Sequence, residues 1–312
     1  MRHDSLIAKI LVLISVGSYF AYALYWFVKT IPWIFTISVG AEYYTPATGL
    51  SFTNSCSVFM AYLMEYSGFI GLMVRVIGAS YALLSCFLIL KNEKTSFPLI
   101  QNKISKALFL EGCYYLSFIP AIIFMLLNFS ALPPISNFLL SIVFVTQILL
   151  ITPPLIKLAT TVKNYETSTD KPSLIRWTGL SYMSFVIALW ITYMLKWREM
   201  MIVDPYLFSA LSIRILGFLN TVIVQSLAVI FAVFGVHLIL KKPSSYKAIK
   251  WLGLSSIFLS LHIIIYVIYV TKVGIIRFIQ FGELWLIPII SVGLYLLLKK
   301  TTRVKNKALA VE

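Results

Sequence analysis

Long apolar runs recur along the whole chain, and each is long enough to cross a lipid bilayer as one helix. A hydrocarbon core of about 30 Å requires about 20 helical residues. Because a backbone in lipid must satisfy its own hydrogen bonds, such runs predict helices. The pattern therefore predicts an all-α fold, a polytopic transmembrane helical bundle of about eight helices in a single integral membrane domain, 1–312. The runs lie near residues 7–27, 69–90, 107–128, 136–156, 177–195, 217–240, 251–270 and 280–298.

The composition excludes a soluble domain. Hydrophobic residues make up 60% of the chain and charged residues 12%, whereas charged residues are about a quarter of a soluble domain. The net charge of +15 would suit nucleic acid, but the basic residues stand in short clusters between apolar runs, where membrane topology explains them. We therefore expect membrane lipid as a partner and no nucleic acid, in a multi-pass protein of the cell membrane.

Lysine and arginine are unevenly shared between alternate segments. If the N-terminus is cytoplasmic, 19 of the 26 Lys and Arg residues fall on inner segments and 7 on the outer side. The positive-inside rule then predicts that both termini are cytoplasmic. The segment 299–312, KKTTRVKNKALAVE, is a basic cytoplasmic tail on this interpretation. Its charges follow from topology more simply than from binding to lipid headgroups or to a partner.

The segment 28–68 differs from the other connections because it is long, mostly uncharged and rich in aromatic residues. It is predicted to be extracytoplasmic and interfacial, since Trp33, Tyr43 and Tyr44 suit the membrane surface. An interfacial helix followed by a Gly/Pro turn is the simpler interpretation. A lid, or a docking surface for an external partner, is the alternative.

Two stretches of the chain resemble each other. RWTGLSYMSF begins at Arg176, KWLGLSSIFL begins at Lys250, and KALFLEGCYY from Lys106 is a fainter copy. The starts are about 70 residues apart, the length of two spans and their loops, which predicts a parallel repeat of two-helix hairpins. The alternative is that interfacial Trp and small packing residues recur in any membrane bundle.

Two ionisable residues inside apolar runs, Glu111 and Arg75, are intramembrane polar candidates for a functional site, because such residues are costly in lipid. If Lys91 and Lys106 mark inner helix ends, Arg75 lies about 24 Å above its end and Glu111 about 7 Å above its own. This difference in height predicts that the two side chains form no ion pair. Arg75 is then expected to extend towards the outer surface or to hold a substrate anion. Glu111 is expected to be protonated or paired with a neighbouring basic residue.

Two histidines, His262 and His237, are the candidate ligands for a haem. Counted from the nearest inner lysine, His237 lies about 6 Å deep and His262 about 18 Å deep, so they suit a bis-histidine haem poorly. His262 can instead carry protons, ligate haem with a different partner, or form a hydrogen bond across a helix interface. The last of these is the interpretation that we adopt for His262.

Prolines interrupt three of the predicted helices. The pair Pro153 and Pro154 is expected to end one helix near its inner side, and Pro120 and Pro288 to kink two others. The sequence contains no P-loop, HExxH, GxSxG or dinucleotide-binding motif. We therefore expect no independent catalytic activity, and lipid-modifying enzymes are disfavoured because no carboxylates or histidines cluster in the inner loops.

The opening MRHDSLIAKILVLISVGSYFAYALYWF, the helices rich in Ile, Leu, Phe and Tyr and the lack of enzyme motifs resemble the hydrophobic membrane subunit of the archaeal cytochrome b558/566 complex of thermoacidophiles. The resemblance covers the whole chain but matches no ligand motif. It implies a subunit of a respiratory electron-transfer complex that anchors or docks a membrane-anchored haem b partner. Haem b is then expected on that partner, and a quinone pocket within this subunit. The alternative function is a permease or a proton-coupled small-molecule transporter, with Glu111, Arg75 and His262 lining the route.

Overall fold

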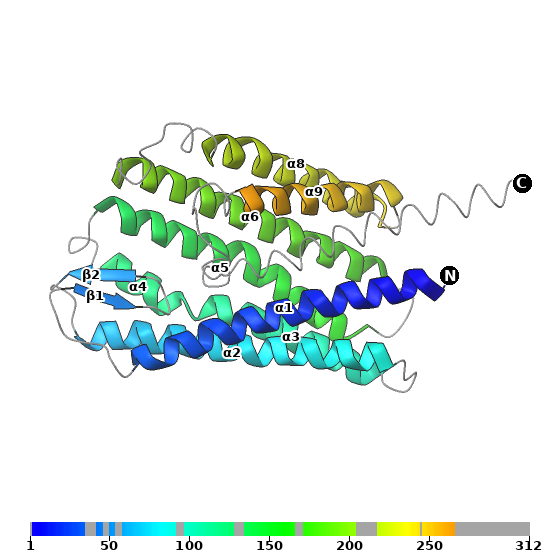
Figure 1. Ribbon diagram of the computed structural model, residues 1–312, viewed down its shortest axis with the longest axis horizontal. Helices are drawn as coiled ribbons and strands as arrows, with labels where there is room; N and C mark the ends of the chain where they lie inside the picture. Colours follow the sequence, from blue (N-terminus) through cyan, green and yellow to red (C-terminus); the bar gives the residue numbers. More distant parts are fainter. Residues whose placement is uncertain are drawn as a thin grey trace, which may run out of the picture.

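The chain forms a bundle of long helices with one small β-hairpin (Figure 1). The computed structural model describes residues 2–34, 42–45, 50–53, 58–91, 97–127, 134–165, 171–203, 217–243 and 245–265. The helices in this part of the chain are α1 (Arg2–Ile34), α2 (Val58–Lys91), α3 (Phe97–Leu116), α4 (Ile119–Leu127), α5 (Pro134–Lys163), α6 (Lys171–Val203), the π-helix η4 (Asn220–Gln225), α8 (Ser226–Lys241) and α9 (Tyr246–Ile265).

Among the described residues, six helical segments are long and apolar enough to cross a membrane, which makes the chain a multi-pass membrane protein. Their mean hydropathy runs from 1.3 to 2.4, and they overlap the first six predicted runs. The seventh run coincides in part with α9, whereas 280–298 lies outside the described residues. The predicted total of eight helices therefore stays a prediction. Large apolar side chains such as Leu149, Phe87 and Phe234, each at least 54% exposed, cover the outer surface of the bundle, as contact with lipid requires.

Part of the segment 28–68 is a two-stranded hairpin, so the expectation of an interfacial helix is wrong for these residues. Strand β1 (Glu42–Thr45) pairs antiparallel with β2 (Leu50–Thr53), with Tyr44 opposite Ser51. The strands contain Tyr, Thr and Phe, which favour extended structure, on either side of a Pro- and Gly-containing turn sequence. The helical part of the segment belongs to α1, which continues to Ile34.

Consecutive long helices run in alternate directions and pack side by side (Figure 1). Helix α1 packs on α2, α2 on α3, α3 on α5, α5 on α6, α6 on α8, and α8 on α9. The N-terminus lies at the end of the bundle where α2 and α5 end and α3 and α6 begin. Lys91, Lys163 and Lys171 stand at this end. The arrangement is compatible with the predicted inner side, and the cytoplasmic location of the two termini stays a prediction.

Helices α6 and α9, which carry the two similar sequences, run in the same direction (Figure 1). Their similar stretches also contact each other, because the Tyr182 hydroxyl lies 3.1 Å from Ser255 Oγ and 2.9 Å from Ser256 Oγ. A shared direction is what a parallel repeat requires, but it also follows from any up-and-down bundle with these helices two spans apart. The repeat therefore stays a prediction.

Glycines set the close packing of α2 on α3. A Cβ atom at Gly78 would lie 3.1 Å from Leu110 Cβ and 3.3 Å from the Ala107 carbonyl oxygen. A Cβ atom at Gly71 would collide with the side chain of Ser117. Arg75 stands between these glycines, one turn from each, and so on the same helix face. The missing side chains let the α3 backbone approach the face of α2 that carries Arg75.

Prolines have different effects in two helices. The helix that begins at Phe97 breaks at Ser117 and Phe118, and α4 follows with Pro120 near its start. This agrees with the predicted kink, since Pro120 has no N–H to continue the hydrogen-bond ladder.

Helix α5, however, passes through Pro153 and Pro154 and ends at Lys163, so the predicted stop is wrong. Side chains of α3 hold the segment beyond these prolines. Ser105 Oγ donates to the Ala159 carbonyl at 2.8 Å, and Gln101 Nε2 donates to the carbonyls of Val162 and Lys163 at 2.7 and 2.9 Å. These bonds occupy carbonyl groups near the C-terminal end of α5 and fix that end against α3.

Candidate functional site

A cavity of about 650 Å³ lies inside the bundle. Residues of α1, α2, α3, α5 and α6 line it, and its wall is mainly aromatic and aliphatic with a few polar groups. This combination of an apolar wall and few convergent polar groups is typical of small-molecule sites. The polar and aromatic residues on which its chemistry depends are Tyr19, Arg75, Glu111, Tyr114, Gln147 and Ser181.

Arg75 and Glu111 form an ion pair in the cavity wall. The distance from Arg75 Nη2 to Glu111 Oε1 is 2.9 Å, and the two side chains are 14% and 18% exposed. The prediction that their heights keep them apart is therefore wrong. Helix α3 begins at Phe97 and not near Lys106, so Glu111 lies about 21 Å from the start of its helix. Arg75 lies about 24 Å from Lys91 at the matching end of α2, which is nearly the same depth.

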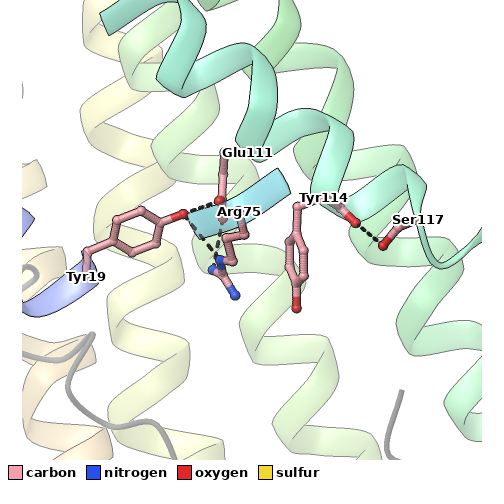
Figure 2. Close-up of polar contacts among 5 residues, drawn as sticks. All are labelled: Tyr19, Arg75, Glu111, Tyr114 and Ser117. Atoms are coloured by element: carbon pink, nitrogen blue, oxygen red, sulfur yellow. Dashed lines mark hydrogen bonds and ion pairs between the residues drawn. The ribbon is translucent and has the colours of Figure 1, made fainter. Parts of the chain in front are cut away.

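Tyr19 of α1 completes a three-residue polar cluster (Figure 2). Its hydroxyl donates to Glu111 Oε2 and accepts a hydrogen bond of 3.3 Å from Arg75 Nε. The Arg75 side chain therefore points into the bundle and does not extend towards the outer surface as predicted. Three helices contribute one residue each, so the cluster depends on the packing of α1, α2 and α3.

Tyrosine rings surround the guanidinium group of Arg75. Its central carbon lies 4.3 Å from the ring centre of Tyr114 and 5.4 Å from those of Tyr19 and Tyr22. Tyr114 stands on α3, about one turn beyond Glu111, and points past the guanidinium in the close-up (Figure 2). Cation–π attraction is strongest where water is excluded, so these rings stabilise a charge that lipid alone would not tolerate. The cluster holds its opposite charges together and offers N–H, O–H and ring surfaces to a ligand.

The sequence signals for this site are partly visible in retrospect. The stretch SFPLIQ, residues 96–101, has a serine and a proline where helices often begin, and it indicates an earlier start for α3. If α3 starts at Phe97, the rise per residue alone places Arg75 and Glu111 at nearly the same depth, about 24 and 21 Å from the matching helix ends. No comparable signal selects Tyr19, Tyr22 and Tyr114 from the 18 tyrosines, because their convergence depends on how three helices pack.

His262 lies outside the cavity, in the interface between α9 and η4. Its side chain is fully buried, and its Nδ1 lies 3.4 Å from the Asn220 carbonyl oxygen. In return, Asn220 Nδ2 donates to the His262 carbonyl at 2.8 Å. The ring of Tyr193 meets the histidine ring edge-on, with 4.8 Å between ring centres. These contacts have the form expected of a histidine that links helices across an interface.

His237 lies on α8, and its side chain is exposed on the surface of the bundle. The structure therefore does not bring His237 and His262 together, since one faces outward and the other is buried against η4. Among the described residues, no group of three or more His, Cys, Asp or Glu side chains could hold a metal ion. Neither histidine lines the cavity that holds Arg75 and Glu111.

The site is thus a cavity between the helices with one ion pair, several tyrosines and four further polar side chains, which are Ser15, Gln147, Ser181 and Thr192. It brings together two of the four predicted candidates, Arg75 and Glu111, and leaves out the two histidines. Comparison of the chain with protein-family models, curated proteins and solved structures gives no match.

Proposed function

We propose that this chain is the membrane subunit of a respiratory electron-transfer complex in the cell membrane and that a quinone binds in its interior cavity. The observation that supports the proposal is the cavity of about 650 Å³ among α1, α2, α3, α5 and α6, with the Arg75–Glu111 pair in its wall. Lipid-soluble quinones reach such a site through the membrane, and a site within the bundle keeps the ring away from water.

The residues of the cavity suit a quinone head group chemically. The ring of a quinone is planar and apolar, and its carbonyl oxygens accept hydrogen bonds. Arg75 and Tyr19 offer N–H and O–H donors, and Tyr114 offers an aromatic face. Glu111 places a carboxylate beside the donors, where a proton of the reduced ring can be accepted. An apolar wall with few, well-placed polar groups is the general pattern for such ligands.

In this proposal haem b belongs to a membrane-anchored partner subunit. His262 engages Asn220 and His237 faces outward, so within the described residues the two do not form a pair of ligands for one haem. The hairpin of β1 and β2 lies at the end of the bundle away from the N-terminus (Figure 1). We propose this outer end as the docking surface for the haem domain of the partner.

The test begins with the complex purified mildly from its native membrane, with every polypeptide identified. A reduced-minus-oxidised visible spectrum is recorded for the complex and then for the isolated subunit, and bound quinone is extracted with organic solvent and quantified. We expect a b-type spectrum that leaves with the partner and quinone that stays with this chain. In the double variant Arg75→Leu with Glu111→Leu, which leaves no unpaired charge, we expect the quinone to be lost while the complex still assembles. A b-type spectrum that stays with the isolated chain, or a complex without haem and quinone, would overturn the proposal.

A second candidate function is a proton-coupled transporter or permease. The observation that favours it is the position of Glu111, an acidic group at the middle of the membrane span Pro98–Ile123 that lines the cavity. The test is uptake into vesicles that contain this chain alone, under an imposed proton gradient. Transport predicts concentrative uptake of a substrate and a strong loss of uptake in Glu111→Gln. Absence of uptake by the wild-type chain, together with a retained quinone, would reject this candidate.

A further inference from the structure

The cavity extends well beyond the ion pair along the bundle. Its lining residues on α6 run from Ser181 to Tyr193, a distance of about 18 Å along the helix axis. Arg75 and Glu111 lie between these limits in depth, so a ligand held at the ion pair has room on the inner side. The polar groups on that inner side decide which ligand can fill it.

Two serines line that inner region, Ser181 of α6 and Ser15 of α1, and Ser15 already has an interaction within the chain. Ser181 is the one considered as a ligand contact. Its side chain is 8% exposed, it lines the cavity, and its Oγ has no hydrogen-bond partner among the described residues. Several other serines in the bundle donate to the carbonyl four residues earlier, at 2.7 to 2.8 Å; these are Ser18, Ser80, Ser85 and Ser260. Ser181 does not use this common way to satisfy its hydroxyl. A buried hydroxyl without a partner costs free energy, which a ligand's hydrogen bond would recover.

Gln147 of α5 adds a second available group. Its side chain lines the cavity and makes no hydrogen bond within the described part of the chain. It lies about 24 Å from Lys163 at the end of α5. Because the Lys163 carbonyl is bonded to Gln101, about 6 Å inside the start of α3, Gln147 lies on the outer side of the ion pair. The donors of the cavity therefore stand at different depths, with Gln147 on the outer side of Arg75 and Tyr19, and with Ser15 and Ser181 on their inner side.

The separation in depth between Ser181 and the Arg75–Glu111 pair fits a ring that carries an oxygen at each end. Ser181 lies about 15 Å from Lys171 at the start of α6. Glu111 and Arg75 lie about 21 and 24 Å from the same end of the bundle, so Ser181 is about 6 to 9 Å nearer that end. A single oxygen can accept from two donors only if they lie within about 6 Å of each other, because each hydrogen bond spans about 3 Å. A second, opposed oxygen suits a separation of about 6 to 9 Å better. A six-membered ring with opposed oxygens bridges most of it.

We propose that Ser181 determines specificity for ligands that carry two opposed ring carbonyls, one bound by Arg75 and Tyr19 and the other by the Ser181 hydroxyl. This inference rests on the proposed quinone function and adds to it the orientation of the ring, upright between the two depths. A ring with one carbonyl is held only at the ion pair.

The experiment compares two probes with the same tail, 2-decyl-1,4-benzoquinone and 2-decylcyclohex-2-enone, which has one ring carbonyl. Their affinities are measured by titration calorimetry in detergent for wild type, Ser181→Ala and the control Ser184→Ala. Ser184 is also buried on α6 but does not line the cavity. Thermal unfolding of each variant establishes that it is folded.

We expect Ser181→Ala to weaken binding of the benzoquinone about tenfold, the usual effect of one lost hydrogen bond. Binding of the one-carbonyl probe, and of both probes to Ser184→Ala, should stay at the wild-type value. Equal weakening of both probes by Ser181→Ala, or no weakening of either, would overturn the role of Ser181 alone. Absence of binding of both probes to wild type would overturn the quinone function and this inference with it.

Discussion

The two halves of the bundle use polar residues differently. In the half built by α1, α2, α3 and α5, charged side chains and tyrosines surround a cavity. In the half built by η4, α8 and α9, the buried polar side chains are uncharged or histidine. Ser255 Oγ donates to the Ala228 carbonyl at 2.6 Å, and Asn220 and His262 exchange contacts across the α9 interface. A polar residue inside a membrane is therefore not by itself a sign of a binding site. The polar groups of the first half differ because they line a cavity.

Loss of Glu111 should have the largest effect on stability. Glu111→Leu leaves the buried Arg75 charge without its carboxylate, and we expect the free energy of unfolding to fall by about 3 to 5 kcal/mol. The double variant Arg75→Leu with Glu111→Leu should recover much of this loss, since it leaves no unpaired charge. The measurement is unfolding in mixed micelles by titration with a denaturing detergent. Equal stability of the single and double variants would show that the ion pair does not stabilise the packing of α1, α2 and α3.

Disruption of the close approach of α2 and α3 should cause the next largest loss of stability. Gly78→Val adds atoms where a Cβ already lies 3.1 Å from Leu110 Cβ, and we expect a loss of about 1 to 3 kcal/mol from overpacking. Separation of the helices should also weaken ligand binding at Arg75. Gly17→Val is the matched control, because nothing lies within 4 Å of a Cβ at Gly17. The same unfolding titration checks both variants, and similar losses at the two glycines would contradict the packing argument.

Substitutions in the half built by η4, α8 and α9 should lower the stability less. Asn220→Leu removes the bond from Asn220 Nδ2 to the His262 carbonyl, and interhelical hydrogen bonds in membranes contribute about 0.6 kcal/mol on average. We expect a stability loss of that order and no change in the affinity of a ligand in the cavity. If ligand affinity fell while stability stayed constant, the interface at η4 would belong to the functional site and the contrast between the halves would fail.

The smallest effect is expected at His237. Its side chain is exposed, so His237→Ala should change stability by less than about 0.5 kcal/mol. The haem spectrum of the purified complex should also be unchanged. Loss of a b-type signal in this variant would make His237 a haem ligand and would place the cofactor on this chain.

Most of the architecture could be predicted from the sequence, because hydropathy and length alone decide which segments can enter lipid. The first six apolar runs correspond to helices long enough to span a membrane. The mistakes came from boundaries. The sequence predicts an inner helix end near Lys106, but α3 starts at Phe97, and it predicts a stop at Pro153 and Pro154, but α5 continues to Lys163. Lys106 lies nine residues inside α3, and its ammonium nitrogen lies 5.5 Å from the ring centre of Tyr81 on α2.

The sequence by itself determined that the chain is a membrane bundle and that Arg75 and Glu111 are costly, noteworthy residues within it. Only the tertiary structure decided that they form a pair, that tyrosines of α1 and α3 surround them and that a cavity lies beside them. The physical reason is that burial in lipid depends on the composition of one segment, which local sequence specifies. The meeting of side chains depends on the start, the rotation and the depth of several helices at once, and the packing of small residues such as Gly78 sets these.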